Sequence, residues 1–299
     1  MRKFLVSCSI MAFLSTGAFA ADLGSGEDSI GQNWAARLGG AFDGYYVNQV
    51  DNDEGTDVND WNVGGNLDFA LGGVSADGWG AQFDVRGSLF ADNPNGDEDD
   101  WTRSYLTGGL HAFTLTSGGL FGAFAGAGVA GDTGDTDEDQ TYWFAGLEGQ
   151  MAMDSAIMFA EIGYLDGDDE FHEGINQAGF GRLGIRFFPQ VNWSLMAAAS
   201  GAFGQQDNGD EPDSDALIGD IKLEAEYAIG GGSTSVFTSY EGTFVSFDGG
   251  DHSTDFHSVM LGFRWRLGGP DLKTAYSGPA SLDLPSVDRW FAYTANEVE

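Results

Sequence analysis

Residues Leu217 to Ile229 read Leu-Ile-Gly-Asp-Ile-Lys-Leu-Glu-Ala-Glu-Tyr-Ala-Ile. From Gly219 onward the odd positions are uncharged and mostly apolar, whereas four even positions in a row carry charge. Side chains of a β-strand point alternately to its two faces, so the pattern predicts a strand with one face in an apolar medium and the other among ions. A protein core and a lipid bilayer both provide an apolar medium, and the rest of the chain must distinguish them.

The same alternation recurs between residues 35 and 268. Its segments are close to the length that a tilted transmembrane strand needs. We therefore predict an all-β fold, a transmembrane antiparallel up-and-down β-barrel of about 12 strands, with 10 or 14 strands as alternatives. The expected strands are 35–47, 60–72, 78–91, 102–115, 119–131, 141–153, 155–165, 176–188, 192–204, 217–229, 234–246 and 255–268.

The connections between these segments alternate in kind. Short turns such as 72–77 and 189–190 alternate with six longer loops that are rich in aspartate and glutamate. Alternate connections of a meander lie at the same end, so the acidic loops share one end and the tight turns the other. Short periplasmic turns and long extracellular loops are typical of outer-membrane barrels. The acidic loops lie around residues 51–54, 97–100, 135–139, 166–170, 210–215 and 248–251.

The N-terminus predicts export. A basic start at Arg2 and Lys3 is followed by a short apolar run and by Ala18-Phe19-Ala20, which indicates a signal peptide over residues 1–20. Residues 21–34 are then a short periplasmic lead. Cys8 is the only cysteine of the chain, so we expect no disulfide. The formal net charge of −35 argues against a nucleic acid as partner.

Charged side chains of the predicted strands share the face opposite the apolar one. Facing lipid, each would cost about 2–4 kcal/mol near the bilayer centre, so we expect them to line a lumen. An arginine-rich sector opposite an acidic one is one possible arrangement, and a set of salt bridges that fills the interior is the other. The candidate lumen and permeation residues are Arg37, Asp43, Asp68, Asp84, Arg86, Arg103, Glu148, Glu161, Arg182, Arg186, Asp220, Lys222, Glu224, Glu226, Glu241, Arg264 and Arg266.

The last predicted strand contains Gly262-Phe263-Arg264-Trp265-Arg266-Leu267, a glycine followed by spaced hydrophobic residues. This motif resembles the signal that ends Gram-negative outer-membrane β-barrels, and residues 34–268 as a whole resemble the porin-like kind. The resemblance implies a location in the cell outer membrane, insertion by the barrel-assembly machinery, and contact with outer-membrane lipid and lipopolysaccharide.

About 30 residues follow this motif. Their prolines, at 270, 279 and 285, predict a mostly irregular tail over residues 269–299. Its only apolar cluster lies between Asp288 and Ala295. The tail can lie in the periplasm or fold back against the mouth of the lumen, and we expect the periplasm.

The acidic loops are candidate divalent-cation sites, because carboxylate oxygens are the ligands that Ca²⁺ and Mg²⁺ prefer. The alternative is a solvated surface that keeps the protein soluble. Cations could also bridge these loops to lipopolysaccharide. The candidate ligands are Asp135, Asp137, Asp139, Asp166 and Asp168.

We expect no enzymatic activity and no cofactor apart from these cations. His257 and Ser258 are adjacent in a strand, so they face opposite walls and cannot form a nucleophile and base pair. The expected function is passive diffusion of small hydrophilic solutes or ions, with a modest preference for cations because of the acidic mouth. The alternative is a non-conducting structural or adhesive barrel whose loops bind divalent cations, lipopolysaccharide or a partner. The pattern does not predict an oligomeric state.

Overall fold

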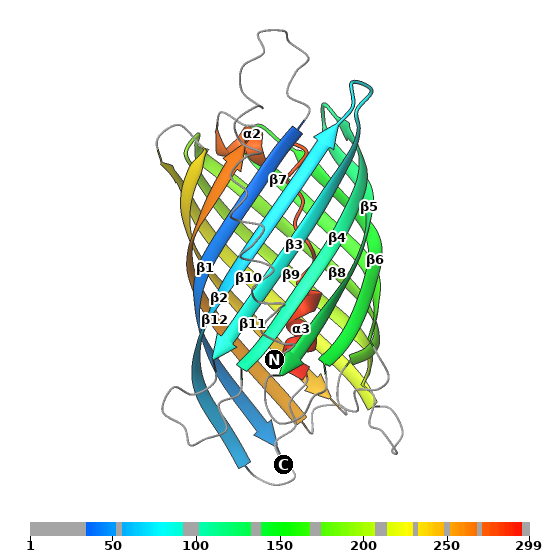
Figure 1. The fold of residues 1–299 in the computed structure, drawn as a ribbon, viewed down its shortest axis with the longest axis vertical. Helices are drawn as coiled ribbons and strands as arrows, with labels where there is room; N and C mark the ends of the chain where they lie inside the picture. Colours follow the sequence, from blue (N-terminus) through cyan, green and yellow to red (C-terminus); the bar gives the residue numbers. More distant parts are fainter. Residues whose placement is uncertain are drawn as a thin grey trace, which may run out of the picture. The chain divides into compact units, whose positions relative to one another are not determined.

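The computed structural model describes residues 34–51, 56–91, 102–132, 139–167, 175–206, 214–229, 233–247, 252–267 and 271–294. Twelve antiparallel strands form a closed barrel (Figure 1), which confirms the predicted fold and strand number. The strands are β1 (Trp34–Asp51), β2 (Thr56–Val74), β3 (Trp79–Ala91), β4 (Thr102–Thr116), β5 (Gly119–Asp132), β6 (Asp139–Ala152), β7 (Ala156–Gly167), β8 (Ile175–Gln190), β9 (Trp193–Gln206), β10 (Ser214–Ile229), β11 (Thr234–Phe247) and β12 (His252–Leu267).

The first and last strands close the barrel. β1 pairs with β2 along one edge and with β12 along the other, in an unbroken register that runs from Ala36 opposite Leu267 to Asp51 opposite His252. Each strand therefore has two neighbours, and every ladder hydrogen bond is made within the wall. A closed wall without free edges is the only β-structure that can span lipid.

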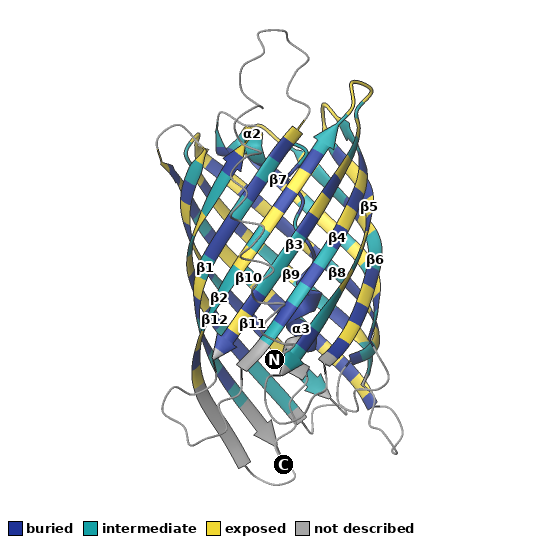
Figure 2. Cartoon of the chain, viewed as in Figure 1, coloured by how far each residue is buried: buried dark blue, intermediate teal, exposed yellow. Residues whose placement is uncertain are grey.

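The two faces of the wall differ as the alternation predicts. In β10, Leu217, Ile221 and Leu223 are exposed on the outside, whereas Glu224 and Glu226 are buried inside. Bands of exposed and buried residues alternate along the strands in the same way around the barrel (Figure 2). The exposed hydrophobic residues form an apolar outer wall. Contact of this wall with the hydrocarbon of a bilayer is favourable, whereas contact with water would be unfavourable.

β5 shows no parity in its sequence, but the structure gives it one. Phe121 is exposed on the outer wall and Phe124 is buried in the interior. The remaining positions are mostly glycine and alanine, which fit either face and so give no pattern.

The described connections are tight. Ser75 to Gly78 close the β2–β3 hairpin, where the φ of 84° at Gly78 favours glycine because a Cβ would be strained there. The six acidic loops, the predicted signal peptide and the predicted periplasmic lead lie at least largely outside the described residues. None of the described helices is long and apolar enough to cross a membrane.

The expectation of an irregular periplasmic tail is wrong. The tail contains two short helices, α2 (Leu272–Tyr276) and α3 (Val287–Thr294), and it packs inside the barrel (Figure 1). Val287, Trp290 and Phe291 are completely buried there. Burial of these side chains is favourable only where an apolar pocket receives them, and the lumen wall provides one. We call residues 271–294 the C-terminal segment.

Candidate functional site

The C-terminal segment runs through the lumen from the end with the tight turns. At that end the Leu272 amide donates to the carbonyl of Val191 in the β8–β9 turn, and Lys273 Nζ donates to the carbonyl of Asp154 in the β6–β7 turn. Further on, α3 packs against β4, β5 and β8. The segment therefore contacts the wall along much of the lumen.

Tyr276, at the end of α2, is held by a group of charged wall residues. Its hydroxyl donates to Glu226 (2.6 Å) and accepts from Arg266 (2.7 Å). The Arg186 guanidinium lies over its ring, 3.8 Å from the centroid. We call Tyr276 together with Arg186, Glu224, Glu226, Arg264 and Arg266 the tyrosine cluster.

The tyrosine cluster is cross-linked by ion pairs. Glu224 lies 2.8 Å from Arg186 and 2.7 Å from Arg264, and Glu226 lies 2.6 Å from Arg266. Burial raises the pKa of Tyr276 to about 12, because a phenolate would lose its hydration and meet the charge of Glu226, although the surrounding guanidinium groups oppose that rise. The Tyr276 hydroxyl is therefore protonated at neutral pH and can donate.

The middle of the C-terminal segment is fixed by a second set of polar contacts. Asp283 lies 2.8 Å from Arg37, which also lies 3.2 Å from Asp68 of the wall. Burial opposes ionisation of Asp283, but Arg37 and other guanidinium groups outweigh it and hold the pKa of Asp283 well below its usual range. The backbone of Leu282 forms two hydrogen bonds with the Gln82 amide side chain, one in each direction.

The α3 end combines charge pairs with aromatic packing. Asp288 lies 3.2 Å from Arg86, and Arg289 lies 3.2 Å from Glu241. The Phe291 ring stacks on Tyr142 with 4.3 Å between centroids and 8° between planes. Trp290 meets the Phe180 ring edge-on at 5.9 Å. These aromatic contacts are the main apolar anchor of the segment.

A histidine that the sequence did not single out lies in the same interior. His111 of β4 lies between two wall carboxylates, with Nδ1 2.9 Å from Glu148 and Nε2 3.2 Å from Asp84. Asp84 also accepts from Gln82, which contacts the C-terminal segment. His111 thus links two predicted lumen carboxylates to the residues that hold the segment.

The predicted lumen residues whose side chains are described lie on the inner face, and most are paired with opposite charges. The hypothesis of separate arginine and acidic sectors is wrong, because Glu224 and Glu226 lie directly between Arg186, Arg264 and Arg266. The arginines come from β8 and β12 and the two glutamates from β10, which lies between those strands in the wall, so the opposite charges come into contact. The side chain of Arg103 lies outside the described residues.

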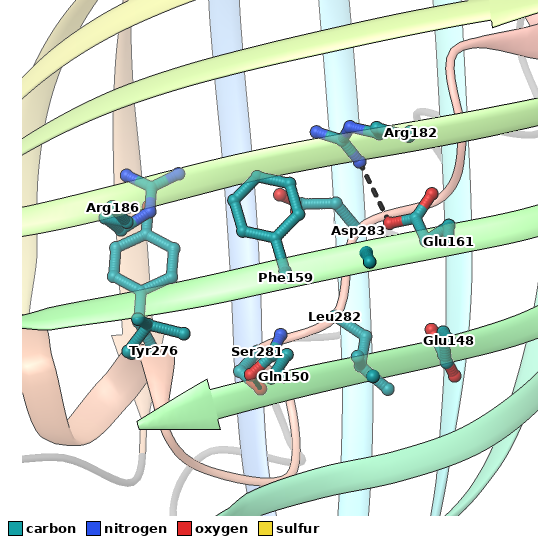
Figure 3. Close-up of a pocket in the computed structure, with 13 residues that line it drawn as sticks. Glu148, Gln150, Phe159, Glu161, Arg182, Arg186, Tyr276, Ser281, Leu282 and Asp283 are labelled. Carbon is teal, nitrogen blue, oxygen red and sulfur yellow. Dashed lines mark hydrogen bonds and ion pairs between the residues drawn. The ribbon is translucent and has the colours of Figure 1, made fainter. Parts of the chain in front are cut away.

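One cavity lies between the wall and the C-terminal segment. Its volume is about 20 Å³, and Glu161, Arg182 and Asp283 are among the side chains around it (Figure 3). Such a volume holds about one water molecule. Arg182 and Glu161 pair at 3.1 Å on its rim, and Tyr276 lies below Arg186 at its other side (Figure 3). The C-terminal segment therefore fills the lumen around this cavity.

The predicted cation ligands are mostly beyond what the structure describes. Asp135, Asp137 and Asp168 lie outside the described residues, as does the side chain of Asp139. Asp166 lies near the end of β7 and is partly exposed. Among the described residues, no group of three or more histidine, cysteine, aspartate or glutamate side chains is arranged to hold a metal ion.

Sequence reasoning missed the residues with which the tail holds the wall. Tyr276, Asp283, Asp288 and Arg289 were assigned no role because strand alternation says nothing about a segment that follows the last strand. One signal was present, since the apolar cluster that begins at Asp288 contains Trp290 and Phe291. Such a cluster indicates a segment that needs a partner surface.

No family model and no curated protein matches the sequence. Comparison of structures does find similar folds. An outer membrane channel from Pseudomonas putida F1 is 10% identical with a TM-score of 0.57, and the match covers 78% of this chain and 95% of that one. The translocator domain of the autotransporter NalP from Neisseria meningitidis is 14% identical with a TM-score of 0.48, over 89% and 98% of the two chains. The closed wall, its apolar outer face and the first of these likenesses show that the chain has the fold of a Gram-negative outer-membrane β-barrel.

Proposed function

We propose that the protein is an outer-membrane channel for passive diffusion of small hydrophilic solutes, and that its C-terminal segment closes the channel in the conformation described. The observation that carries the proposal is the charged inner wall. It is lined by arginine and carboxylate side chains, which a solvated pathway accommodates readily, while the outer wall is apolar. The similar structure from Pseudomonas putida F1 is itself a channel.

The contacts of the segment are suited to release. Asp283, Asp288 and Arg289 are charged groups that regain hydration when the segment leaves, and so do their wall partners Arg37 and Arg86. Buried ion pairs contribute little net stability because the loss of hydration offsets most of the attraction. Displacement of the segment therefore costs mainly the burial of its apolar side chains.

The acidic loops supply the proposed selectivity. A mouth with a large excess of carboxylates concentrates cations and repels anions, more strongly at low ionic strength. The proposal is thus a modest preference for cations, and bound Ca²⁺ or Mg²⁺ at the loops, or lipopolysaccharide bridged by such ions, would reduce it. Reversal potentials in a salt gradient, with and without a chelator, measure both effects.

Conductance in planar bilayers tests the channel. We expect infrequent steps from the wild-type protein and more frequent ones from the double variant Asp283→Asn, Asp288→Asn, which removes both carboxylates that bind Arg37 and Arg86. Asp271→Asn is the matched control, because the Asp271 side chain bonds within the segment, to Thr274 in α2, where asparagine also caps a helix. If neither the wild-type protein nor the double variant gives steps, the channel proposal is refuted.

The filled lumen favours one other function, a non-conducting barrel that serves as a surface protein. In that case the segment is a permanent part of the interior, and the acidic loops bind divalent cations, lipopolysaccharide or a partner. Absence of conductance together with a thermal stability that rises with added calcium would support this second function.

A further inference from the structure

We propose that the wall around Tyr276 is a binding site for phenols, small aromatic rings that carry a hydroxyl group, and that Tyr276 occupies this site when the channel is closed. The inference rests on the proposed function, because a solute reaches this part of the wall only after the C-terminal segment has shifted. It goes further by assigning a class of solute to a defined place in the lumen.

The wall contacts both parts of a phenol. Two guanidinium groups lie over the ring of Tyr276, with Arg186 Cζ 3.8 Å and Arg266 Cζ 4.8 Å from its centroid. The Phe188 ring lies 6.3 Å away. A guanidinium within about 6 Å of an aromatic face is attracted to the π electrons of the ring. The ring portion of the site therefore favours an aromatic group over an aliphatic one of the same size.

The hydroxyl is recognised by charged groups. It donates to Glu226 (2.6 Å) and accepts from Arg266 (2.7 Å) and Arg264 (3.2 Å). Hydrogen bonds to charged groups are about twice as strong as those between neutral groups. An aromatic ring without a hydroxyl would leave Glu226 with one donor fewer. The carboxylate also favours the neutral phenol over the phenolate.

All these contacts come from the barrel strands. Arg186 belongs to β8, Glu226 to β10, and Arg264 and Arg266 to β12. Glu224 pairs with both Arg186 and Arg264, and Ser235 hydrogen-bonds both Glu226 and Arg266. These pairs do not involve Tyr276, so they keep the site in shape when the segment leaves. A preorganised site of this kind loses little entropy when a small ligand binds.

The full-length variant Tyr276→Ala opens the site, and phenol itself is the probe. We expect saturable binding of one phenol per chain by calorimetry, and about 10- to 100-fold weaker binding of benzene, which lacks the hydroxyl, and of cyclohexanol, whose ring is not aromatic. The wild-type protein, with Tyr276 in place, should bind phenol much more weakly. Phe180→Ala is the matched control, because Phe180 is buried against Trp290 in a hydrophobic cluster separate from that of Tyr276, so its removal opens a cavity away from the tyrosine cluster. Equal affinities for phenol and benzene in Tyr276→Ala would overturn the proposal.

A second measurement does not depend on the folding of that variant. In a chain with Cys8→Ser and Ser281→Cys, the new thiol is buried in the lumen, since Ser281 is only 4% exposed. Phenol should compete with Tyr276 and accelerate reaction of this thiol with a charged reagent, whereas cyclohexanol should not. No acceleration by phenol would overturn the proposal. Phenol binding without conductance in any variant would refute the channel proposal and support the phenol site. Conductance without phenol binding would support the channel proposal and refute the phenol site.

Discussion

Replacement of Trp290 by alanine should loosen the C-terminal segment to a degree that the structure sets. Trp290 is fully buried in the lumen, against the Phe180 ring. Truncation of a buried tryptophan to alanine costs about 3–5 kcal/mol. Each 1.36 kcal/mol changes an equilibrium tenfold, so the released population of the segment should rise about 150- to 5,000-fold. The outer wall and its ladder are untouched by the change, and the barrel should remain folded.

The assay is thiol reaction at Ser281→Cys in the Cys8→Ser chain. When the segment opens and closes faster than the reagent reacts, the rate follows the open population, as proteolysis of an opened state does. The reaction rate should therefore rise by the same factor as the population. Trp193→Ala is the control, because Trp193 lies on the outer wall against Tyr227 and its loss should leave the rate unchanged.

An unchanged rate in Trp290→Ala, with the barrel still folded, would refute the reasoning. It would mean that residues near Ser281 open without release of α3, so that the segment opens in separate parts and not as a unit. A rise as large in Trp193→Ala would refute it in a different way, because the thiol would then report loosening of the whole barrel.

Three further predictions concern the charges of the C-terminal segment and the outer wall. The pKa of Asp283 in the folded chain lies below its ordinary value of 3.8, so its pair with Arg37 should stabilise the segment above about pH 4 and lose this effect as the pH falls. Hydrogen exchange of the Leu282 and Leu284 amides, corrected for the intrinsic rate, should therefore become faster at low pH. The variant Asp283→Asn should lack this pH dependence. The pKa of Tyr276 is raised from 10.0 to about 12, so its contribution to the stability of the segment should be complete below pH 10 and be lost as the pH rises through 12. An ultraviolet titration should find one tyrosine that ionises at this high pH and that is missing in Tyr276→Phe. On the outer wall, Leu261→Arg should lower the free energy of unfolding in phospholipid vesicles by about 2–4 kcal/mol, and Leu267→Arg, at the end of β12, by about 0–1 kcal/mol. A denaturant titration measures both values, and equal losses would contradict the lipid contact of Leu261.

The barrel could be predicted from the sequence because a period-two pattern carries its information locally. In β10, the identities of Leu223 and Glu224 suffice to tell which face is apolar, and the sorting of the loops along the chain then indicates that this face meets lipid. The number of strands followed from counting such segments. Only β5 gave no pattern, because its many glycine and alanine residues are compatible with both environments.

The arrangement of charges inside the barrel was harder to predict. Alternation places Arg186, Glu224 and Arg264 on the inner face but does not say which of them touch, because contact depends on the register of three separate strands. The register places Glu224 between the two arginines. Its charge is thereby neutralised locally, and the expected field across the lumen does not arise from these residues.

This pairing also decides what a charge reversal in the lumen would measure. Replacing Glu224 and Glu226 by lysine would place two more cations among Arg186, Arg264 and Arg266. We expect this change to break the tyrosine cluster, so that a change in conductance would report release of the segment as well as selectivity.

The position of the tail could not be predicted because it depends on a surface that exists only after the barrel has formed. The prolines indicated a mostly irregular tail, while 14 strands stayed possible from the sequence. Phe291 finds its partner in Tyr142, which lies about 150 residues earlier in the chain and points inward from β6. No local pattern records such a pairing, so a segment with a few aromatic residues looks the same in sequence whether it is free or enclosed.

The place of the C-terminal segment in the chain has a consequence for biogenesis. β12, which completes the seam with β1, ends at Leu267, and α2 begins at Leu272. The strand that closes the cylinder is therefore synthesised before the C-terminal segment that packs inside it. A chain truncated after Leu267 would keep all twelve described strands of the wall and lack the segment inside it, so closure of the seam and filling of the interior by this segment are separable events in the assembly of this barrel.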